Sequence, residues 1–359
     1  MKQIGKYTVI SGLVKTDFSD IYLCQDPVLD ADVAIKVFNP KGKNVGKKAK
    51  YGPKVWRARF IEEARLLARL DHPYIVAVRD LAFTEDDKPF FVMPYYPANL
   101  IYEIGKDVFD EEGIAKLKPQ WRPRRLAVKR AITVLRQVLA ALAFLHHKGL
   151  VHRDIKPGNV LLTEKGGGSV KLCDFGMVKQ PETSSHSRSG IWIGTLDYIA
   201  PEQRRSAREV DAHADVYSAG ALAYRMLTGT LPVGAFPPPH KMVPEIPRGV
   251  SNLIMRSLNR APANRPFDAG MMLRLLNKEL IARKPLLLDP KAKIKAKVTS
   301  KPKAVEQSAV AKTAPKRKAV LKSKTKPKPK AKITVKPAAK PKKTARIRKK
   351  AKVSVGSGA

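Results

Sequence analysis

Residues 152–159 place several chemically active side chains within eight consecutive positions. The run reads His-Arg-Asp-Ile-Lys-Pro-Gly-Asn, and Asp174-Phe175-Gly176 follows fifteen residues after Asn159. Carboxylate and amide oxygens are ligands that magnesium prefers, a carboxylate can accept a proton during catalysis, and a lysine supplies a positive charge. We therefore take this stretch as the candidate catalytic site.

The stretch resembles the catalytic loop HRDxKxxN and the DFG motif of the eukaryotic-like Ser/Thr protein kinase family. Five fixed letters at about one in twenty each match by chance on the order of once in a few million starting positions, so the motif is specific. Further signatures stand in the family's order across about residues 7–282. They are Val33-Ala34-Ile35-Lys36, Glu63 nine residues before His72-Pro73, Gly194-Thr195 with Tyr198, Ala200-Pro201-Glu202, Asp215, and Arg265-Pro266, whose arginine would pair with Glu202.

The resemblance implies an enzyme that transfers the γ-phosphoryl group of ATP, with Mg2+, to Ser/Thr hydroxyls of protein substrates. Phosphoryl transfer needs mainly positioning and the neutralisation of charge. By the resemblance, Lys36 would hold the α- and β-phosphates of ATP, and Glu63 would hold Lys36. Asn159 and Asp174 would be the ligands of the magnesium ions.

Two residues of the motif would act at the transferred group. By the same resemblance, Asp154 would orient the substrate hydroxyl and accept its proton, and Lys156 would stabilise the transferring phosphoryl group. A lysine at position 156, together with Thr195, is the pattern of Ser/Thr kinases, whereas tyrosine kinases differ at the first of these positions.

Apolar residues stand where the family lines the pocket for adenine. By the resemblance the lining residues are Ile21, Ala34 and Leu161, with Met93 as the gatekeeper. Pro94 lacks a backbone N–H, so Tyr96 is the expected hinge donor to the adenine.

The family's glycine-rich loop over the ATP phosphates, GxGxxGxV, is degenerate here. Aligning Phe18 and Ile21 with the family's aromatic residue and valine places Val14, Thr16 and Ser19 at the three glycine positions. Glycine would let the backbone approach the phosphates without a Cβ. The chain is therefore either an active kinase with a weaker hold on ATP or a catalytically weak or inactive kinase-fold scaffold, a pseudokinase. We favour the first, because every residue that handles charge is retained.

Arg153 precedes the catalytic aspartate. In the family this arginine usually pairs with a phosphate on the activation segment, which orders that segment. The hydroxyls available there are Thr183, Ser184, Ser185, Ser187 and Ser189. We therefore hypothesise autophosphorylation within residues 183–189, and the alternative is a merely solvated, serine-rich loop.

The elements that would position these groups follow from residue type and periodicity. Strand-like runs surround a helix expected over Trp56–Leu70, and a further strand is expected over Ile75–Phe83. Residues 101–125 are polar and irregular, and they read as an insertion before a long helix at Leu126–His146.

These elements predict a small β-rich lobe followed by a larger helical lobe, and the resemblance implies that they form the α+β, two-lobed protein-kinase fold. The kinase domain would span residues 7–284, with a small β-rich N-lobe at about 7–93 and a larger helical C-lobe at about 97–284. Residues 285–359 would follow as a disordered Lys/Ala/Pro-rich tail.

The charge of the chain is concentrated in that tail. The formal net charge is +39, and residues 291–359 hold 25 Lys and Arg against one acidic residue, Glu306. The segment has no aromatic residue, so it cannot bury enough apolar surface to offset its ordering entropy. Its composition is similar to that of linker-histone tails.

Such a tail indicates a polyanionic partner. Lysines that neutralise phosphates release counterions and so bind nucleic acid without reading its sequence. Nucleic acid bound by residues 291–359 is the favoured partner and would tether the kinase. An anionic membrane surface and a merely solubilising tail are the alternatives.

The remaining composition bears on the compartment. The longest apolar run, Val138–Leu145, has eight residues, whereas a membrane-spanning helix needs about 18–20. Cys24 and Cys173 lie far apart and match neither a disulfide framework nor a zinc site. We expect a soluble, cytoplasmic protein that associates with nucleoid or chromatin if the tail binds DNA.

Overall fold

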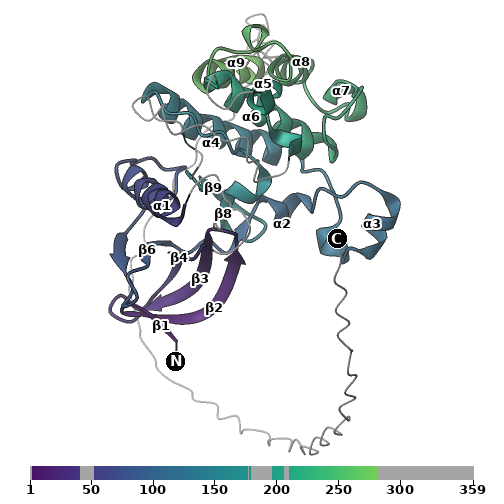
Figure 1. Cartoon of the computed structure of the whole chain (residues 1–359). Helices are drawn as coiled ribbons and strands as arrows, with labels where there is room; N and C mark the ends of the chain where they lie inside the picture. The colour runs from purple at the N-terminus through teal and green to yellow at the C-terminus, as the bar shows by residue number, and fades with distance from the viewer. Residues whose placement is uncertain (1, 41–51, 177, 179–195, 206–209, 282–359) are drawn as a thin grey trace, which may run out of the picture. The chain divides into compact units, whose positions relative to one another are not determined.

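The computed structural model of the chain describes an N-terminal lobe and a C-terminal lobe (Figure 1). The described residues are 2–40, 52–176, 178, 196–205 and 210–281. The predicted tail, residues 183–189 and Thr195 lie outside them.

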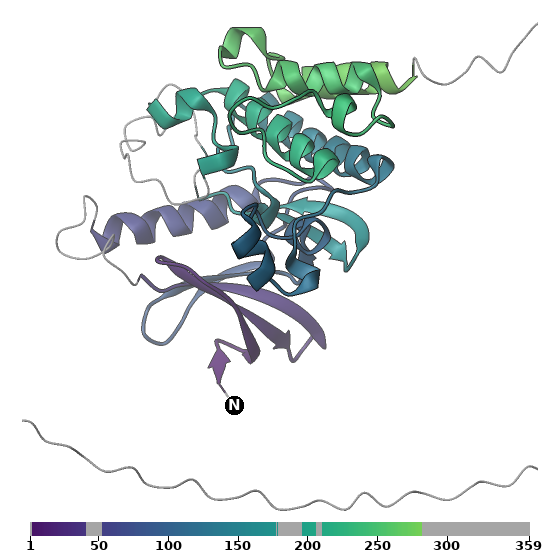
Figure 2. The ribbon, with the colours of Figure 1, turned by 90° about the vertical axis from the view of Figure 1, so that its right-hand side faces the viewer.

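The N-terminal lobe is one six-stranded antiparallel sheet with a helix beside it. The strands lie in the order β1-β2-β3-β4-β6-β5. The elements are β1 (Gln3–Ile4), β2 (Tyr7–Lys15), β3 (Ser19–Asp26), β4 (Ala31–Phe38), α1 (Pro53–Ala68), β5 (Asp80–Phe83) and β6 (Pro89–Pro94). Helix α1 lies on the side of the sheet that faces the helical lobe (Figure 1, Figure 2).

Helix α1 forms because its apolar residues recur at helical spacing. Phe60, Ala64 and Leu67 are buried along one face, as the three- and four-residue spacing predicts. The ring of Phe60 packs against Phe38 of β4 and Phe91 of β6, with centroids 5.6 and 5.1 Å apart. This packing fixes the helix relative to the sheet.

The strand predicted over Ile75–Phe83 is only partly formed. Strand β5 begins at Asp80, whereas Ile75 forms an isolated parallel bridge with Leu172. The main chain on both sides of Ile75 is bonded to Leu172. The Leu172 carbonyl accepts from the Val76 N–H, and the Leu172 N–H donates to the Tyr74 carbonyl. The prediction was too long because this apolar run is divided between two partners.

The C-terminal lobe is mainly helical and carries a small sheet of order β7-β8-β9. Its helices are α2 (Leu100–Ile104), α3 (Glu111–Lys116), α4 (Val128–His147), α5 (Pro201–Arg205), α6 (Ala212–Thr228), α7 (Pro239–Met242), α8 (Arg248–Ser257) and α9 (Ala269–Ile281). Its strands are β7 (Ala98–Asn99), β8 (Val160–Glu164) and β9 (Gly167–Leu172), and its 3-10 turns are η1 (Pro119–Trp121), η2 (Pro157–Asn159), η4 (Leu196–Tyr198) and η5 (Pro262–Asn264).

Helices α4 and α6 form the centre of this lobe. Thirteen of the seventeen residues of α6 are buried, so this helix is covered on all sides rather than along one stripe. Helix α4 ends in a left-handed Gly149 with φ of 71°, and the Leu150 N–H donates back to the Leu145 carbonyl at 3.0 Å. This is a glycine-terminated helix end of the Schellman type, and it directs the chain into the candidate catalytic loop.

The prediction that residues 101–125 are irregular was wrong in part, because this segment contains α2, α3 and η1.

No helix in the described part of the chain is long and apolar enough to cross a membrane.

Candidate active site

Lys36 and Glu63 form a close ion pair between the sheet and α1. The Nζ atom of Lys36 lies 2.7 Å from Oε1 and 2.9 Å from Oε2 of Glu63. The rings of Phe60 and Phe91 flank the ammonium group, with centroids 5.9 and 5.6 Å away. Because both carboxylate oxygens are engaged and the surroundings are apolar, the lysine is held in one place.

Asp174 lies next to this pair, with its Oδ1 atom 3.6 Å from Nζ of Lys36. Burial alone would lower the pKa of Lys36, but the carboxylates of Glu63 and Asp174 raise it above its ordinary value. Desolvation by the surrounding protein would raise the pKa of Asp174, whose side chain is only partly covered, but Lys36 and Lys156 hold it below its usual range. Lys36 is therefore cationic and Asp174 anionic near neutral pH.

Asp154, Lys156 and Asn159 are joined directly by hydrogen bonds. The Nζ atom of Lys156 lies 3.0 and 2.8 Å from the two carboxylate oxygens of Asp154. Nδ2 of Asn159 donates to Oδ2 of Asp154 and to its main-chain carbonyl, both at 2.8 Å. Charge-assisted contacts of this kind fix the orientation of the carboxylate.

Asp215, at the start of α6, is hydrogen-bonded to the main chain of the catalytic loop. Its carboxylate accepts from the N–H groups of His152 and Arg153, both at 2.8 Å, and contacts Nε2 of His146 at 2.9 Å. Burial opposes ionisation of Asp215, but these hydrogen bonds and the histidines hold its pKa below its usual range. Arg153 has a left-handed φ of 70°, a strained conformation that persists where the surrounding contacts fix it.

The segment around Asp174 is tied to the same loop. Phe175 is buried and meets the His152 ring edge-on, with centroids 4.8 Å apart. The Cys173 N–H donates to the Asn159 carbonyl at 3.0 Å. The two predicted metal ligands, Asn159 and Asp174, therefore lie on adjacent bonded segments.

The donor chemistry of Asn159 and Asp174 fits a magnesium ion. Asn159 uses Nδ2 for both of its side-chain hydrogen bonds, which leaves Oδ1 as the ligand atom, and the side chain of Asp174 is 44% exposed. Within the described residues, no group of three or more His, Cys, Asp or Glu side chains gathers to hold a metal. Magnesium is usually held by one or two carboxylates together with substrate phosphates, so two protein ligands suffice.

The predicted adenine-lining residues come from both lobes. Ile21, Ala34 and Met93 lie on the neighbouring strands β3, β4 and β6, and Ala34 pairs directly with Met93. Tyr96 lies in the connection from β6 to β7, Leu161 lies on β8, and both are half-buried. Their role towards adenine stays a prediction.

The loop between β2 and β3 is closed by Thr16 instead of being opened by glycine. The Thr16 hydroxyl accepts from the N–H of Ser19 at 3.0 Å and of Phe18 at 3.3 Å, and it donates to the Ser19 carbonyl at 2.9 Å. This is a side-chain-stabilised turn. This turn was not predicted from the sequence, although a threonine three residues before a serine between two strands is a pattern that can indicate one.

Phe18 fastens the tip of this loop to α1. Its ring lies 4.1 Å, centroid to centroid, from that of Trp56 on α1. Its carbonyl accepts from the Asn39 N–H at 2.9 Å. The loop is therefore connected to the helix that carries Glu63.

The segment after the catalytic site is anchored by two contacts. Glu202 forms a two-pronged ion pair with Arg265, with N–O distances of 2.6 and 2.9 Å, as the resemblance implies. Nε2 of the neighbouring Gln203 donates to the Arg153 carbonyl at 2.8 Å. Helix α5 is thus bonded to the main chain next to Asp154.

The side chain of Arg153 is buried and incompletely paired. Its Nε and Nη2 atoms have no hydrogen-bond partner among the residues that the structure describes. Burial lowers its pKa to about 10. A buried cation whose N–H donors are only partly satisfied is costly, which marks this position as one that an anion would stabilise.

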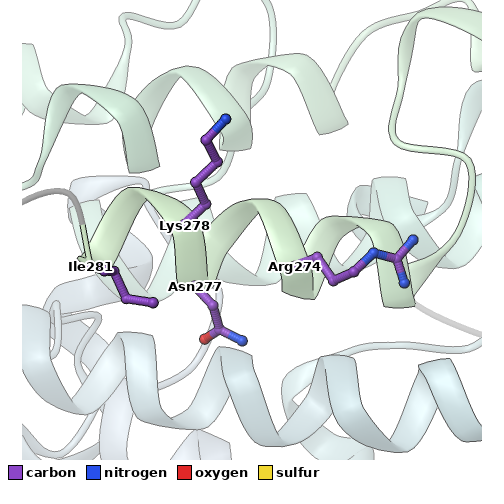
Figure 3. A pocket seen from close by; sticks show the side chains of 4 residues that line it. All are labelled: Arg274, Asn277, Lys278 and Ile281. Carbon is purple, nitrogen blue, oxygen red and sulfur yellow. The ribbon is translucent and has the colours of Figure 1, made fainter.

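A separate hollow lies on α9 and is lined by Arg274, Asn277, Lys278 and Ile281 (Figure 3). Figure 3 shows Lys278 and Asn277 pointing to opposite sides of the helix, so the four side chains do not converge on one point. None of the predicted site residues borders it, and we assign it no role in the chemistry.

The two-lobed fold and this arrangement of charged groups define a chain of the protein kinase class. A family model described as "Protein kinase domain" matches residues 7–267, and the chain belongs to this family. The predicted two-lobed α+β fold is confirmed by the crystal structure of the Mycobacterium tuberculosis PknI kinase domain. That structure matches with a TM-score of 0.53 and 26% identity, over 77% of this chain and 98% of that one.

Curated relatives are bacterial Ser/Thr kinases that are longer than this chain. The DNA damage-responsive serine/threonine-protein kinase RqkA of Deinococcus radiodurans is 32% identical over 287 residues, covering 76% of this chain. The serine/threonine-protein kinase PknL of Mycobacterium bovis is 32% identical over 283 residues, covering 75% of this chain. The chain spans 39% of the first relative and 64% of the second.

Proposed function

We propose that the chain is an ATP- and magnesium-dependent protein kinase that phosphorylates Ser and Thr side chains. The observation that carries the proposal is the Asp154 carboxylate, held by both Lys156 and Asn159. This carboxylate lies in a loop bonded to the segment of Asp174, whose neighbour Lys36 is already paired with Glu63. These contacts bring together residues from four separate parts of the sequence, which supports the proposal because phosphoryl transfer depends on positioning and charge neutralisation.

Each residue has a distinct task in this proposal. Lys36, kept cationic and fixed by Glu63, binds the α- and β-phosphates of ATP. Asp154 orients the acceptor hydroxyl and takes its proton. Lys156 stays beside Asp154 and neutralises charge on the transferring group.

Magnesium, when bound by Asn159 and Asp174, would neutralise charge on the phosphate oxygens. Lys156 and the family pattern at Thr195 support hydroxyl acceptors on Ser and Thr rather than Tyr. The names of the two relatives support the same acceptor class.

The pseudokinase alternative rests on the missing glycines alone. The hydrogen bonds of Thr16 explain in another way why the β2–β3 loop lacks glycine. The turn forms without glycine, and the N–H groups of Phe18 and Ser19 are engaged by the Thr16 hydroxyl. Because the charged residues are all in place, a weaker grip on ATP is the better supported consequence.

The test compares wild type with Asp154→Asn in labelled ATP, magnesium and a generic acceptor such as myelin basic protein. We expect the variant to transfer phosphate about 10²–10⁴-fold more slowly, since a positioned base contributes that much. ATP binding, measured with a fluorescent nucleotide, should be retained in both proteins. Equal and undetectable transfer by both would favour the scaffold.

We further propose that residues 183–189 are autophosphorylated, because the buried and incompletely paired Arg153 would gain a phosphate partner. Mass spectrometry of protein incubated with ATP tests this. An unmodified segment in an active enzyme would contradict it.

We also propose that residues 291–359 tether the kinase to nucleic acid. The support is their charge, 25 Lys and Arg against one Glu. With six to ten phosphate contacts, affinity should fall roughly 10³–10⁵-fold between 50 and 200 mM salt.

Deleting residues 291–359 and measuring binding to duplex DNA across salt provides the test. Unchanged affinity would rule out the tether, and equal binding of the full chain to anionic vesicles would favour a membrane surface instead.

A further inference from the structure

The segment between α2 and α4 forms a long loop, here called the excursion (residues 105–124), whose two ends are hydrogen-bonded to each other. The Lys106 N–H donates to the Trp121 carbonyl, and the Arg124 N–H donates to the Ile104 carbonyl, both at 2.9 Å. At the base, Gly105 has φ of 78°, and a Cβ there would meet the Arg122 carbonyl oxygen at 2.1 Å. Only glycine fits this position, so the excursion leaves and returns at one point.

One residue of the excursion, Asp107, makes two contacts with distant parts of the chain. Its Oδ1 atom accepts from Nε of Arg225 on α6 at 2.7 Å, and its Oδ2 atom accepts from the Tyr198 hydroxyl at 2.8 Å. Arg225 and Tyr198 are almost fully buried. Each carboxylate oxygen has its own partner, so the two contacts can be removed separately.

The Arg225 guanidinium also belongs to this junction. Its Nη1 donates to the Arg124 carbonyl at 3.1 Å and its Nη2 to the Ile104 carbonyl at 2.9 Å. Its charge is therefore directed at the base of the excursion and at Asp107. Burial and the neighbouring Asp107 carboxylate raise the pKa of Tyr198, so its hydroxyl keeps its proton and donates.

Tyr198 connects this junction to the catalytic loop. It ends η4, and α5 begins three residues later at Pro201. Gln203 of α5 is bonded to the Arg153 carbonyl, and Asp154 is the next residue. The chain from Tyr198 to Gln203 is therefore bonded to Asp107 at one end and to the main chain beside the proposed catalytic base at the other.

We propose that Asp107 is a positioning residue for the protein substrate, because it fixes Tyr198 and with it residues 196–205 beside Asp154. This inference rests on the proposed function. An acceptor hydroxyl must reach Asp154, so the segment bonded to the adjacent main chain is where the acceptor chain docks. Tyr198 is buried and supports this surface without touching the substrate.

The experiment compares Asp107→Asn, Tyr198→Phe and the double variant with wild type. Asp110→Asn is the matched control, because Asp110 is an exposed residue of the same excursion whose side chain only caps α3. Tyr198→Phe keeps the ion pair between Asp107 and the buried Arg225 intact, so it remains informative if Asp107→Asn does not fold.

Two measurements are made on the full chain. Hydrogen exchange of residues 196–205 should be faster in both single variants and unchanged in the control. The KM for myelin basic protein should rise about 2- to 10-fold on loss of the hydrogen bond, while the KM for ATP stays within about 2-fold. The double variant should show no further increase over Asp107→Asn, because the two residues act as one unit.

The outcomes separate the two proposals. Unchanged exchange of residues 196–205 in an active enzyme would overturn the role of Asp107 while leaving the proposed function intact. Equal rises in the KM for ATP and for the acceptor would reduce Asp107 to a general structural anchor and overturn its substrate role. An inactive wild type would count against the proposed function and against the substrate role together.

Discussion

The hydroxyl of Thr16 bonds both main-chain polar groups of Ser19, accepting from its N–H at 3.0 Å and donating to its carbonyl at 2.9 Å. The N–H groups of Phe18 and Ser19 therefore already have a partner in the protein. A nucleotide phosphate approaching this loop must compete with the Thr16 hydroxyl for them.

Removing that hydroxyl should strengthen ATP binding. We expect Thr16→Val, which keeps the shape of the side chain, to lower the KM for ATP about 2- to 10-fold, because one net hydrogen bond contributes about 0.5–1.5 kcal/mol. Thr16→Ser keeps the hydroxyl and is the control. A KM that rises in Thr16→Val would mean that the closed turn helps to hold the phosphates.

Lys156 should affect the rate rather than ATP binding. In Lys156→Met, Asp154 keeps its two bonds to Asn159 but loses its cationic neighbour. We expect kcat to fall about 10²–10³-fold, as for other lost charge-stabilising donors, with the KM for ATP little changed. A loss that appears only in KM would place Lys156 in substrate binding instead.

Arg153 should destabilise the unphosphorylated protein. Its unpartnered atoms carry a desolvation cost of about 1–3 kcal/mol, so we expect Arg153→Met to raise the melting temperature of phosphatase-treated protein. After autophosphorylation the sign should reverse, because the arginine then has a partner. Arg205→Met, at an exposed arginine, is the matched control, and a drop in the melting temperature of the dephosphorylated variant would contradict the prediction.

His152 should make the fold sensitive to mild acid. Burial lowers the pKa of His152, although the carboxylates of Asp215, Asp154 and Asp174 act in the opposite direction. Below about pH 6.5 this histidine is protonated in the unfolded chain but stays neutral in the folded chain. The free energy of unfolding therefore falls as the pH falls, by up to about 1.4 kcal/mol per pH unit. Melting temperatures between pH 5 and 7 measure this.

The change of melting temperature with pH should be smaller in His152→Gln than in wild type. Burial also lowers the pKa of His72, so part of the slope should remain, and His72→Gln measures that part. The same slope in wild type and His152→Gln would exclude His152 as the source.

The sequence predicted the parts of the site that are set by motif and periodicity. Lys36, Glu63, Asp154, Asn159 and Asp174 were named from short patterns, and the helix that places Glu63 follows from its apolar spacing. These features are local, so residue order along the chain carries the information.

The features that the sequence did not predict depend on contacts between distant residues. Ile75 reads as part of a strand, but its pairing with Leu172 is decided by the other lobe. Asp107 reads as one acid in a polar insertion, and only the folded chain brings it to Tyr198 and Arg225. Tertiary partners of this kind leave no periodic signal.

The contact between Phe18 and Trp56 has a consequence for how ATP and α1 affect each other. Trp56 and Glu63 are seven residues apart, close to two full turns, and so lie on one face of the helix. A rearrangement of the loop tip that breaks the ring contact removes one of the contacts that hold α1, while the packing of Phe60 on the sheet remains. If nucleotide binding displaces the loop tip, occupancy by nucleotide and the position of α1 become linked equilibria, and by reciprocity a partner that shifts α1 would change nucleotide affinity by the same factor.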